Sequence, residues 1–569
     1  MAFQVSPGVE VKEIDATNAV PAVSTSNGGF AGSFNWGPTN QIVTVGSENE
    51  LAETFGSPDD STAKHFLVAA SFLKYGNALK VVRVSSGHLN ATAQGTGQLI
   101  KNDDDYANNY ADGSLNLGNW AAKHPGVLGN SLKVSMISQG ISNFSNWTYA
   151  SNFDAAPGTS TAAAAVGVTN DELHIAVIDE DGAISGTAGT VLETFGFLSQ
   201  ASDAKKDDGT SNYYKDVITN QSEYIRWIDH DTNLDEAGFT LAAAKAANTD
   251  SEGANTFKTH TSAMEASLSG GTDDNSPTTG EIASGFDLLE DSETVDVNLL
   301  FAAPDADGAE AIAEDLIAIA NARKDCMAFI SPPIEDTVGS STPAANVKAF
   351  ADGLTSTSYA ACDSTALYVY DKYNDVYRYI AASGHMAGLC ANTDSVADAW
   401  FSPAGVNRGQ LLGVTKLAFN PKKADRDTLY KARVNPIVSL PGQGTLLFGD
   451  KTLLSRPSAF DRINVRRLFI ALEKAISTAA KAQLFEFNDE FTRAQFRNLV
   501  EPFLRDVKGR RGLTDFSVIC DTTNNTSQVI DTNKFVADIF IKPARSINFI
   551  SLNFVATRSG VEFSEISGS

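Results

Sequence analysis

The stretch VDVNLLFAAPDADGAEAIAEDLIAIANARKDCMAFISPP, residues 295–333, contains two apolar runs on either side of a helical pattern. VDVNLLFAAP and CMAFISPP are short and continuously apolar, as buried strands are. AEAIAEDLIAIANARKD lies between them and predicts a helix. A strand, a helix and a strand in this order form a crossover between parallel strands. The stretch therefore predicts a parallel sheet in an α/β domain.

The flanks of this unit extend the prediction. HFLVAASFLKYG (65–76) has helical spacing, and ALKVVRV is a buried strand that ends at Val84. YVYDKYNDVYRYI predicts a hairpin that turns at residues 372–375. Residues 120–294 mix short strands with connections rich in Gly, Ser, Thr and Asp, which is typical of an inserted domain of strands and exposed loops.

Two amphipathic helices are predicted near the end of the chain. DRINVRRLFIALEKAI (461–476) and FTRAQFRNLVEPFLRDV (491–507) both place apolar residues at i, i+3, i+4 and i+7. Asp461 is the predicted cap of the first helix. Four arginines lie off the apolar stripes and are expected to face outward: Arg466, Arg467, Arg493 and Arg497.

Length and charge limit the class of protein. A chain of 569 residues exceeds what one core organises, so roughly three or four domains are expected. A net charge of −26 argues against a protein that wraps nucleic acid. Residues 461–569 contain 15 Lys and Arg against 13 Asp and Glu, a net of +2, so the first 460 residues have −28. This asymmetry fits either a solvated acidic shell or a separate surface that meets a partner.

The remaining composition predicts a reduced, membrane-free protein. The four cysteines, Cys326, Cys362, Cys390 and Cys520, are far apart, as reduced thiols in a cytosolic compartment are. The start lacks the basic and apolar pattern of a signal peptide. No run approaches 18 apolar residues, so no membrane insertion is expected.

The sequence lacks the motifs that we tested for nucleotide binding and zinc binding. The turn APDADGAE lacks GxGxxG, and Asp305 and Asp307 would repel a phosphate there. GTLLFGDKT (444–452) resembles a P-loop, but Asp450 separates its Gly and Lys. His385 and Cys390 are too few ligands for zinc. We therefore expect no catalytic residue, no metal and no cofactor, and a protein that is not an enzyme.

Both ends of the sequence alternate with a period of two. Such alternation predicts strands with one apolar face. Each could lie on its own body or cross to a neighbouring molecule. The residues on the apolar faces are Phe3, Val5, Pro7, Val9 and Val11 at the start, and Ile550, Leu552, Phe554 and Ala556 near the end.

Several longer motifs resemble one known family. SAFDRINVRRLF, FNDEFTRAQFR, VICDTTNNT and KPARSINFISLNFVAT closely resemble segments of the contractile tail sheath proteins of large myophages. LSGGTDD, YDKYNDVYR, the opening SPGVEVKEID and HPGVLGNSLKV also match, in the order of that family. The matches extend from residue 6 to residue 566, nearly the whole chain.

The resemblance implies a structural subunit of the virion. Such subunits are assembled in the bacterial host cytoplasm and form stacked hexameric rings around a tail tube, between baseplate and tail terminator proteins. Contraction drives the tube through the host envelope for genome delivery. The terminal strands would pair with a sheet of a neighbouring subunit by β-augmentation. The implied arm residues are Phe3, Val5, Val9, Val11, Ile550, Leu552, Phe554, Val561 and Phe563.

The resemblance also implies a domain plan. Residues 1–22 are an N-terminal arm and 546–569 a C-terminal strand and arm. Residues 23–85 and 295–381 form a middle α/β domain, and 86–294 an outer β-rich insertion. Residues 382–545 form a tube-proximal core domain with a mixed sheet and helices. Relatives have a sizeable outermost domain where this chain has only residues 86–119, so a reduction to a loop is expected.

The basic segment RDVKGRRG is a candidate tube contact. We expect its cations, Arg505, Lys508, Arg510 and Arg511, to face an acidic tube surface. A solvated loop, or a contact with the acidic body of another subunit, explains the same residues equally well. The closest rival function is the sheath of a bacterial contractile injection particle, and a Rossmann-like metabolic enzyme is a remote one.

Overall fold

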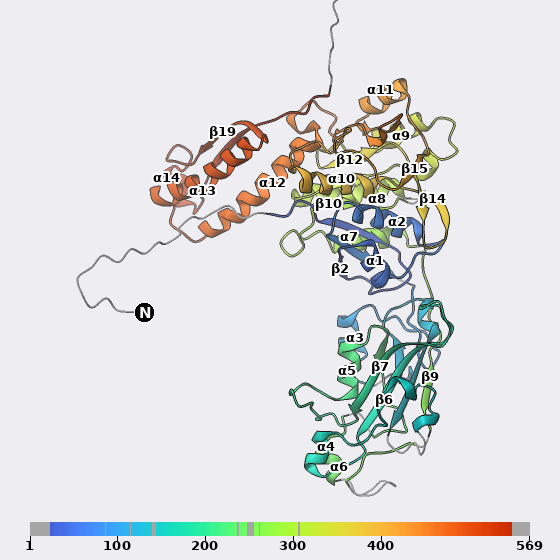
Figure 1. Ribbon diagram of the computed structural model, residues 1–569. Coiled ribbons are helices and arrows are strands. Elements are labelled where there is room, and N and C mark those ends of the chain that lie inside the picture. The colour runs from blue at the N-terminus through green and yellow to red at the C-terminus, as the bar shows by residue number, and fades with distance from the viewer. Residues whose placement is uncertain are drawn as a thin grey trace, which may run out of the picture. The chain divides into compact units, whose positions relative to one another are not determined.

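The computed structural model describes residues 23–548, except 86, 114, 139–143, 236–237, 247–254, 261 and 305–307. The chain divides into two compact units (Figure 1). The described part of the C-terminal unit is residues 23, 398–402 and 462–548, and the large unit contains residues 24–397 and 403–461. The protein is thus a mixed α/β chain with several sheets, as predicted.

A seven-stranded sheet organises the large unit. Its strand order is β16-β12-β11-β10-β1-β3-β2, and β2 alone runs antiparallel to its neighbour. The predicted crossover is confirmed, because β10 and β11 pair in parallel and α8 (Ala309–Arg323) connects them. The strands are β1 (Gly28–Gly32), β2 (Ile42–Val45), β3 (Leu79–Arg83), β10 (Leu299–Phe301), β11 (Met327–Ile330), β12 (Ala360–Asp363) and β16 (Val434–Asn435).

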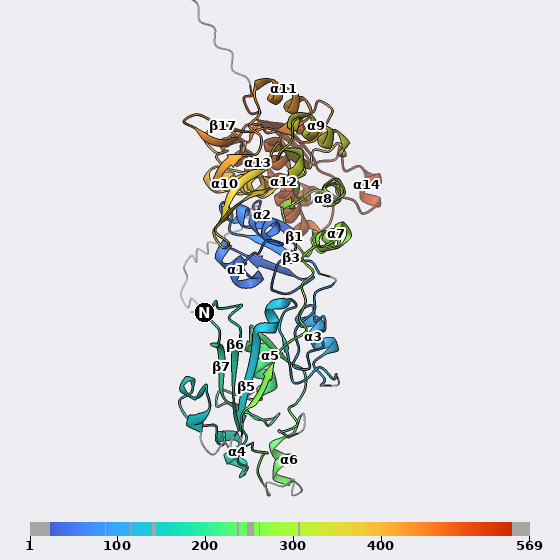
Figure 2. The same cartoon turned by 90° about the vertical axis from the view of Figure 1, so that its right-hand side faces the viewer.

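Helices cover both faces of this sheet (Figures 1 and 2). On one face, Phe72 of α2 stacks on Phe301 of β10, and Phe30 of β1 lies beside the same ring. On the other face, Ala31 and Leu300 join a core with α7, α8 and α9. Alternate residues of each strand therefore supply two separate cores. The covering helices are α2 (Ala63–Leu73) and α10 (Ser383–Val396) on the first face, and α7 (Thr279–Asp287), α8 and α9 (Pro343–Gly353) on the second.

The boundary between the units differs from the predicted domain start at residue 382. Helix α10 is buried along ten of its residues and packs on the sheet and on α2. Strand β16 then forms one edge of the same sheet. Residues 382–397 and 403–461 therefore belong to the large unit. This region also contains α11 (Lys423–Lys431), β17 (Ile437–Leu440) and β18 (Gly444–Leu447).

The predicted hairpin at residues 372–375 is confirmed. Strands β13 (Leu367–Asp371) and β14 (Val376–Ile380) pair in antiparallel register, and β15 (Val414–Leu417) adds a third strand. Tyr368, Tyr370, Tyr377 and Tyr379 contact one another across the pair.

The insertion, residues 86–294, folds around its own core. A four-stranded antiparallel sheet has the order β7-β6-β5-β9, and β4 pairs with β8 beside it. The strands are β4 (Trp120–Ala122), β5 (Leu132–Ser138), β6 (Glu172–Asp179), β7 (Thr190–Ser199), β8 (Ile225–Trp227) and β9 (Met264–Ser267). The described short helices that accompany these strands are α3 (Asp103–Asn109), α4 (Thr161–Val166), α5 (Tyr214–Gln221) and α6 (Leu241–Ala246).

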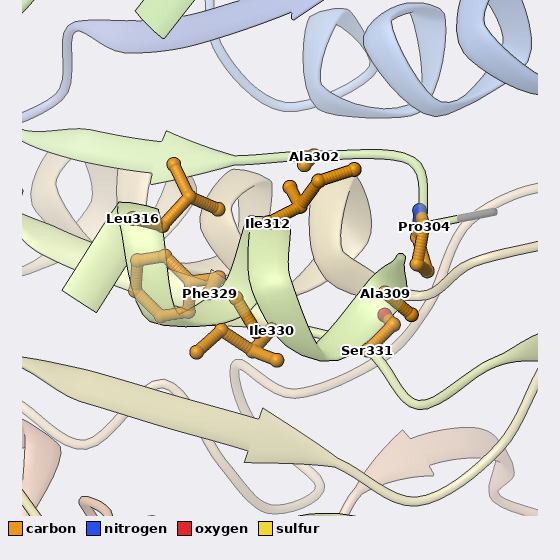
Figure 3. A pocket seen from close by; sticks show the side chains of 9 residues that line it. Ala302, Pro304, Ala309, Ile312, Leu316, Phe329, Ile330 and Ser331 are labelled. Atoms are coloured by element: carbon orange, nitrogen blue, oxygen red, sulfur yellow. The ribbon is translucent and has the colours of Figure 1, made fainter. Parts of the chain in front are cut away.

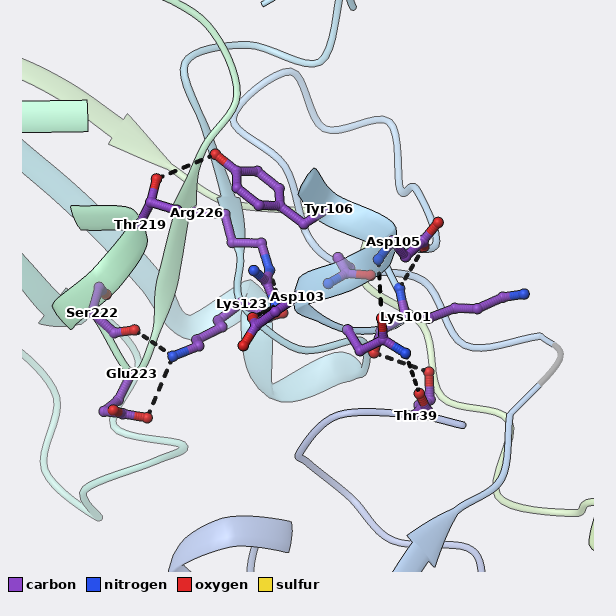
Figure 4. Close-up of polar contacts among 12 residues, drawn as sticks. Thr39, Lys101, Asp103, Asp105, Tyr106, Lys123, Thr219, Ser222, Glu223 and Arg226 are labelled. Atoms are coloured by element: carbon purple, nitrogen blue, oxygen red, sulfur yellow. Dashed lines mark hydrogen bonds and ion pairs between the residues drawn. The ribbon is translucent and has the colours of Figure 1, made fainter. Parts of the chain in front are cut away.

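The segment expected to be a loop, residues 86–119, is partly helical. Arg226 of β8 forms an ion pair of 2.8 Å with Asp103 of α3 and lies over the ring of Tyr106 (Figure 4). The Tyr106 hydroxyl donates to the carbonyl of Trp227 at 2.6 Å. Because Tyr106 is only 2% exposed and anchors a small apolar cluster, the loop prediction is wrong for this part of the chain.

Arg83 lies at the end of β3, where the sheet leads into the insertion. Its side chain is fully buried and donates to the carbonyls of Phe34 (2.8 Å) and Gly37 (2.7 Å). Burial lowers the pKa of Arg83 to about 9, although the charge of Asp273 acts in the opposite direction. Asp273 in turn accepts from the backbone amide of Val127 in the insertion. Arg83 thus holds the connecting backbone in place.

The described part of the C-terminal unit contains two long helices, a two-stranded sheet and a short helix. Its elements are α12 (Ile463–Ala480), α13 (Glu490–Gly509), β19 (Leu513–Ile519), α14 (Ser527–Asp531) and β20 (Asp538–Pro543). The predicted cap at Asp461 is wrong, because α12 begins after Arg462. Arg466, Arg467 and Arg493 are buried, at 6%, 3% and 7% exposure, so the prediction that they face outward is also wrong.

Candidate assembly surface

The antiparallel pair β19–β20 is the core of the candidate surface. Phe516 lies opposite Ile541, and Val518 lies opposite Ile539. All four side chains pack on the cluster formed by α12 and α13. The alternate positions face away from the helices, and among them Phe540 is 59% exposed. One face of the ribbon is thus fixed to the unit and the other is open.

Both edges of this ribbon are available for pairing within the described part of the chain. Each of β19 and β20 has the other as its one strand partner there. The outer N–H and C=O groups of such a ribbon are a template for a further strand. The ladder continues to the amide of Ala544, which donates to the carbonyl of Gly512 at 3.1 Å.

The helices beneath the ribbon make it rigid. Leu468 and Leu472 of α12 meet Val500, Leu504 and Val507 of α13 in one buried cluster. The side chain of Asp489 accepts from the amide of Thr492 at 2.8 Å and caps α13. Because the cluster supports the inner face of both strands, an added strand would meet a preformed edge.

The predicted arm residues cannot be compared with this surface. Phe3, Val5, Val9, Val11, Ile550, Leu552, Phe554, Val561 and Phe563 lie outside the described residues. Their pairing stays a prediction.

The four predicted tube-contact cations lie close together but do not form a loop. Arg505 and Lys508 are in the last two turns of α13, and Arg510 and Arg511 follow directly. Cations at this end also stabilise the helix dipole. All four are exposed. The loop prediction for this segment is therefore wrong, because the helix continues through Gly509.

Two of these cations have partners within the unit. Lys508 forms an ion pair of 3.2 Å with Asp515 of β19. Arg510 pairs with Asp398 and lies 5.0 Å from the ring centre of Trp400, whose indole N–H donates to the Arg510 carbonyl. These contacts hold residues 398–402 against the end of α13. Arg505 and Arg511 have no carboxylate partner among the residues that the structure describes.

Sequence reasoning missed an exposed apolar cluster in the segment after α12 and at the start of α13, where Phe491 lies. Leu484, Phe485, Phe487 and Phe491 are 63%, 105%, 83% and 75% exposed. Phe485 also has a φ of +71°, a conformation that costs a non-glycine residue energy. The phenylalanine-rich stretch LFEFNDEF was the one sequence signal for these exposed rings. The helical pattern of residues 491–507 indicates only the buried face of that helix, so it does not predict them.

The hollow described at the carboxyl ends of β10 and β11 is too small for a nucleotide. The hollow between β10, β11 and the start of α8 has a volume of about 10 Å³, enough for one water molecule (Figure 3). It is almost wholly apolar, and its lining is Ala302, Pro304, Ala309, Ile312, Ala313, Leu316, Phe329, Ile330 and Ser331. A nucleotide does not fit there. Among the described residues, no three His, Cys, Asp or Glu side chains are placed to hold a metal ion.

Asp363, at the end of β12, is a fully buried carboxyl group. Ser331 donates its hydroxyl to one oxygen, and the amide of Thr365 donates to the other at 3.3 Å. Burial outweighs these hydrogen bonds and raises the pKa of Asp363 to about 7. The Cys362 thiol beside it is also fully buried, and burial raises its pKa. We assign both groups to the packing of the sheet.

No helix in the described ranges is long and apolar enough to cross a membrane.

Three family models match consecutive parts of the chain. The phage tail sheath protein central domain matches residues 277–453, and the phage tail sheath C-terminal domain matches residues 455–557. The N-terminal region of domain III of a tail sheath protein matches residues 29–84.

Solved structures show the same fold. The helical sheath of the anti-feeding prophage in its contracted state aligns over 98% of this chain and 100% of its own, with a TM-score of 0.52 at 14% identity. A sheath tail protein from Listeria innocua aligns over 92% and 96%, with a TM-score of 0.53 at 10% identity. The fold is therefore that of a tail sheath subunit.

Curated relatives define the family. The chain is 34% identical to the tail sheath protein of Vibrio phage KVP40, over 99% of both chains. It is also 34% identical to the tail sheath protein of Enterobacteria phage T4, over 99% of both. The chain belongs to the phage tail sheath protein family. It is a structural, non-enzymatic subunit of the contractile tail sheath of the virion.

Proposed function

We propose that the chain polymerises into hexameric rings that stack helically around a tail tube. Contraction of this sheath drives the tube through the host envelope and delivers the genome. Its partners are the tail tube protein along the axis and the baseplate and tail terminator proteins at the ends. The helical, contracted sheath of the anti-feeding prophage, which shares the fold, supports this proposal.

The open edges of the β19–β20 ribbon carry the proposal. A two-stranded ribbon with its inner face fixed to helices can accept strands from neighbouring subunits. The alternating ends of the chain supply such strands. Because the donated strand and the accepting edge are different surfaces, the contact is heterologous and extends into rings and helices. The plan of three domains with two arms is part of this proposal; the two compact units divide at residue 462, whereas the plan starts the core domain at residue 382.

The experiment compares the two faces of the C-terminal strand. We expect Ile550→Ser, Leu552→Ser and Phe554→Ser together to prevent tubular polymers and to leave thermal unfolding of the subunit unchanged. Burial of three such side chains in the proposed contact would contribute roughly 4–9 kcal/mol, so their loss should raise the critical concentration for assembly at least about a thousandfold. Electron microscopy and sedimentation measure the polymer.

The matched control changes the other face of the same strand. Ser551→Thr and Asn553→Thr keep the strand and should polymerise as the unmodified protein does. Normal polymers from the triple serine variant would refute strand donation. Unfolding of that variant would show instead that the strand belongs to its own core. Deletion of residues 1–15 tests Phe3, Val5, Val9 and Val11 in the same way.

The basic end of α13 is the proposed tube contact. Arg505 and Arg511 are exposed and have no carboxylate partner among the described residues, so their charges are available to an acidic tube surface. Arg505→Glu with Arg511→Glu should weaken tube-templated assembly and remove part of its salt dependence. Lys534→Glu, an exposed charge in the same unit, is the control. If tube-free polymerisation is lost equally, the cations contact another subunit instead.

A further inference from the structure

A basic hollow lies beside the first residues of β16 in the large unit. Its volume is about 340 Å³. Four cations line it, together with Ser455, Asp461 and two apolar residues. The cations are Lys431, Arg433, Lys451 and Arg456. The hollow is therefore positive, although the first 460 residues have a net charge of −28.

Backbone carbonyls hold two of these cations in place. Arg433 donates to the carbonyls of Leu453 (3.1 Å) and Ala351 (3.3 Å) and also contacts Asp352. The Lys451 ammonium donates to the carbonyl of Tyr430 at 2.7 Å and lies over the ring of the same residue. The carbonyls orient both side chains, while Asp352 offsets part of the charge of Arg433. The positive charge of the wall therefore depends mainly on the two other cations.

The other two cations point to an external partner. Lys431 and Arg456 are exposed, and neither has a carboxylate partner within the described ranges. Gathering like charges in a concave surface raises its potential and favours an anionic occupant. Because the protein is proposed to assemble with copies of itself, we expect the anionic group that binds in this hollow to belong to another copy of the chain.

The connection between α7 and β10 has the complementary charge. Asp287, Glu290, Asp291 and Glu293 are exposed within seven residues. Burial, and then the charges of Asp287 and Glu290, raise the pKa of the nearby Asp315. Leu288 between them is 39% exposed, and the hollow has Leu454 and Pro457 in its lining to receive it.

The two surfaces belong to different parts of the sheet. The hollow adjoins β16, the edge strand, whereas α7 packs on β1 and β3, beyond β10. A contact between them can therefore join one copy to the next. The first copy in such a series keeps one of the two surfaces unoccupied, and the last copy keeps the other. Such a heterologous contact propagates.

We propose that the basic hollow of one subunit binds the acidic segment 287–293 of a second copy of this chain. This inference rests on the proposed polymerisation and names one charged contact within it.

The first experiment reverses charges on each side. Lys431→Glu with Arg456→Glu should raise the critical concentration for assembly about tenfold and reduce its salt dependence. Glu290→Lys with Glu293→Lys should do the same, and the four changes together should restore assembly. Lys205→Glu with Lys206→Glu, two exposed lysines of the insertion, is the matched control and should have no effect.

The second experiment detects the contact without a polymer. A subunit with Arg456→Cys and Glu290→Cys should form disulfide-linked oligomers on mild oxidation, because the four natural cysteines are buried. Arg456→Cys with Lys205→Cys should not. An unchanged critical concentration after reversal of the hollow, failure of the fourfold variant to recover, or no linked oligomers would each overturn the proposal. If polymers are lost but disulfide-linked oligomers still form, the proposed stacking of rings is refuted and the proposed contact between hollow and acidic segment is retained.

Discussion

Asp363 gives the large unit a pH-dependent stability that one substitution should remove. The carboxyl group is fully buried, and burial raises its pKa to about 7 in the folded protein. In the unfolded chain it has the ordinary value near 4. Asp363→Asn replaces it with a neutral amide of nearly the same shape, which has no proton to gain or lose in this range.

The sign and the size follow from proton linkage. Below pH 4 both states are protonated, so the group has no effect. Between pH 4 and pH 7 only the unfolded carboxyl is ionised, so folding takes up a proton. The free energy of unfolding then falls by up to about 1.4 kcal/mol for each pH unit, and it is constant above pH 7. The full loss is about 4 kcal/mol, of which about 2 kcal/mol falls between pH 5.5 and pH 7.

The assay is hydrogen exchange of the β11 and β12 amides, corrected for the intrinsic rate, from pH 5.5 to pH 8. We expect the stability of the unmodified protein relative to Asp363→Asn to fall by about 2 kcal/mol up to pH 7 and then level off. Any constant cost of the amide cancels in this slope. A flat difference over the whole range would refute a raised pKa at Asp363.

Asp371 provides a control of opposite sign. Burial acts to raise its pKa, but hydrogen bonds from Asn374 and Arg378 and from two backbone amides outweigh burial and lower it. A lowered pKa stabilises the fold above the unfolded pKa, and this contribution is lost as the pH falls through the folded value. Asp371→Asn should therefore destabilise the protein throughout pH 5.5–8, with no slope.

Three further results are expected. Leu504→Ala, at a fully buried position, should lower the free energy of unfolding of the C-terminal unit by about 2–5 kcal/mol. The exposed control Arg505→Ala should change this free energy by less than about 0.5 kcal/mol, and urea unfolding measures both variants. Arg83→Met should leave two buried carbonyls without a donor and cost roughly 2–5 kcal/mol, seen as faster limited proteolysis near Phe34, and unchanged cleavage would contradict this role. A thiol reagent should find no reactive cysteine in the native protein and all four after denaturation, since all four are buried; rapid native labelling would be the contrary result.

Elements with strong local patterns could be predicted from the sequence. The crossover at residues 295–333 has two apolar strands and a helix in immediate succession, so local preference and final packing agree. The hairpin at 372–375 has the same property. Both depend on contacts between neighbours in the sequence.

The buried arginines show where the pattern fails. An apolar stripe predicts one covered face, and Val465, Leu468 and Leu472 lie on it. Arg466 and Arg467 are nevertheless covered as well, because α12 is enclosed on more than its apolar face. A long arginine stem can line such a contact while its guanidinium finds polar partners. Nothing in a single helix indicates how many faces its surroundings cover.

Only part of the candidate surface could be predicted from the sequence. Phe516 and Val518 alternate with polar residues, which is the pattern of a strand with one buried face. Ile539 and Ile541 have Phe540 between them, so their run is continuously apolar and does not indicate which face is buried. Both strands are short and lie far apart in the sequence, so their pairing cannot be predicted from the sequence alone. The basic residues of the hollow come from α11, from the start of β16 and from residues 451–456, so only the fold brings them together.

The five residues 398–402 alter how the two units are joined mechanically. The chain passes between the units after residue 23, after residue 397, after residue 402 and again after residue 461. A tension applied between the units is therefore divided among four covalent connections, where a single linker would bear all of it. The ion pair of Asp398 with Arg510 and the hydrogen bond from Trp400 anchor residues 398–402 to the C-terminal unit. In the contraction proposed above, force on the subunit would thus be shared among several joints and would not act on one alone.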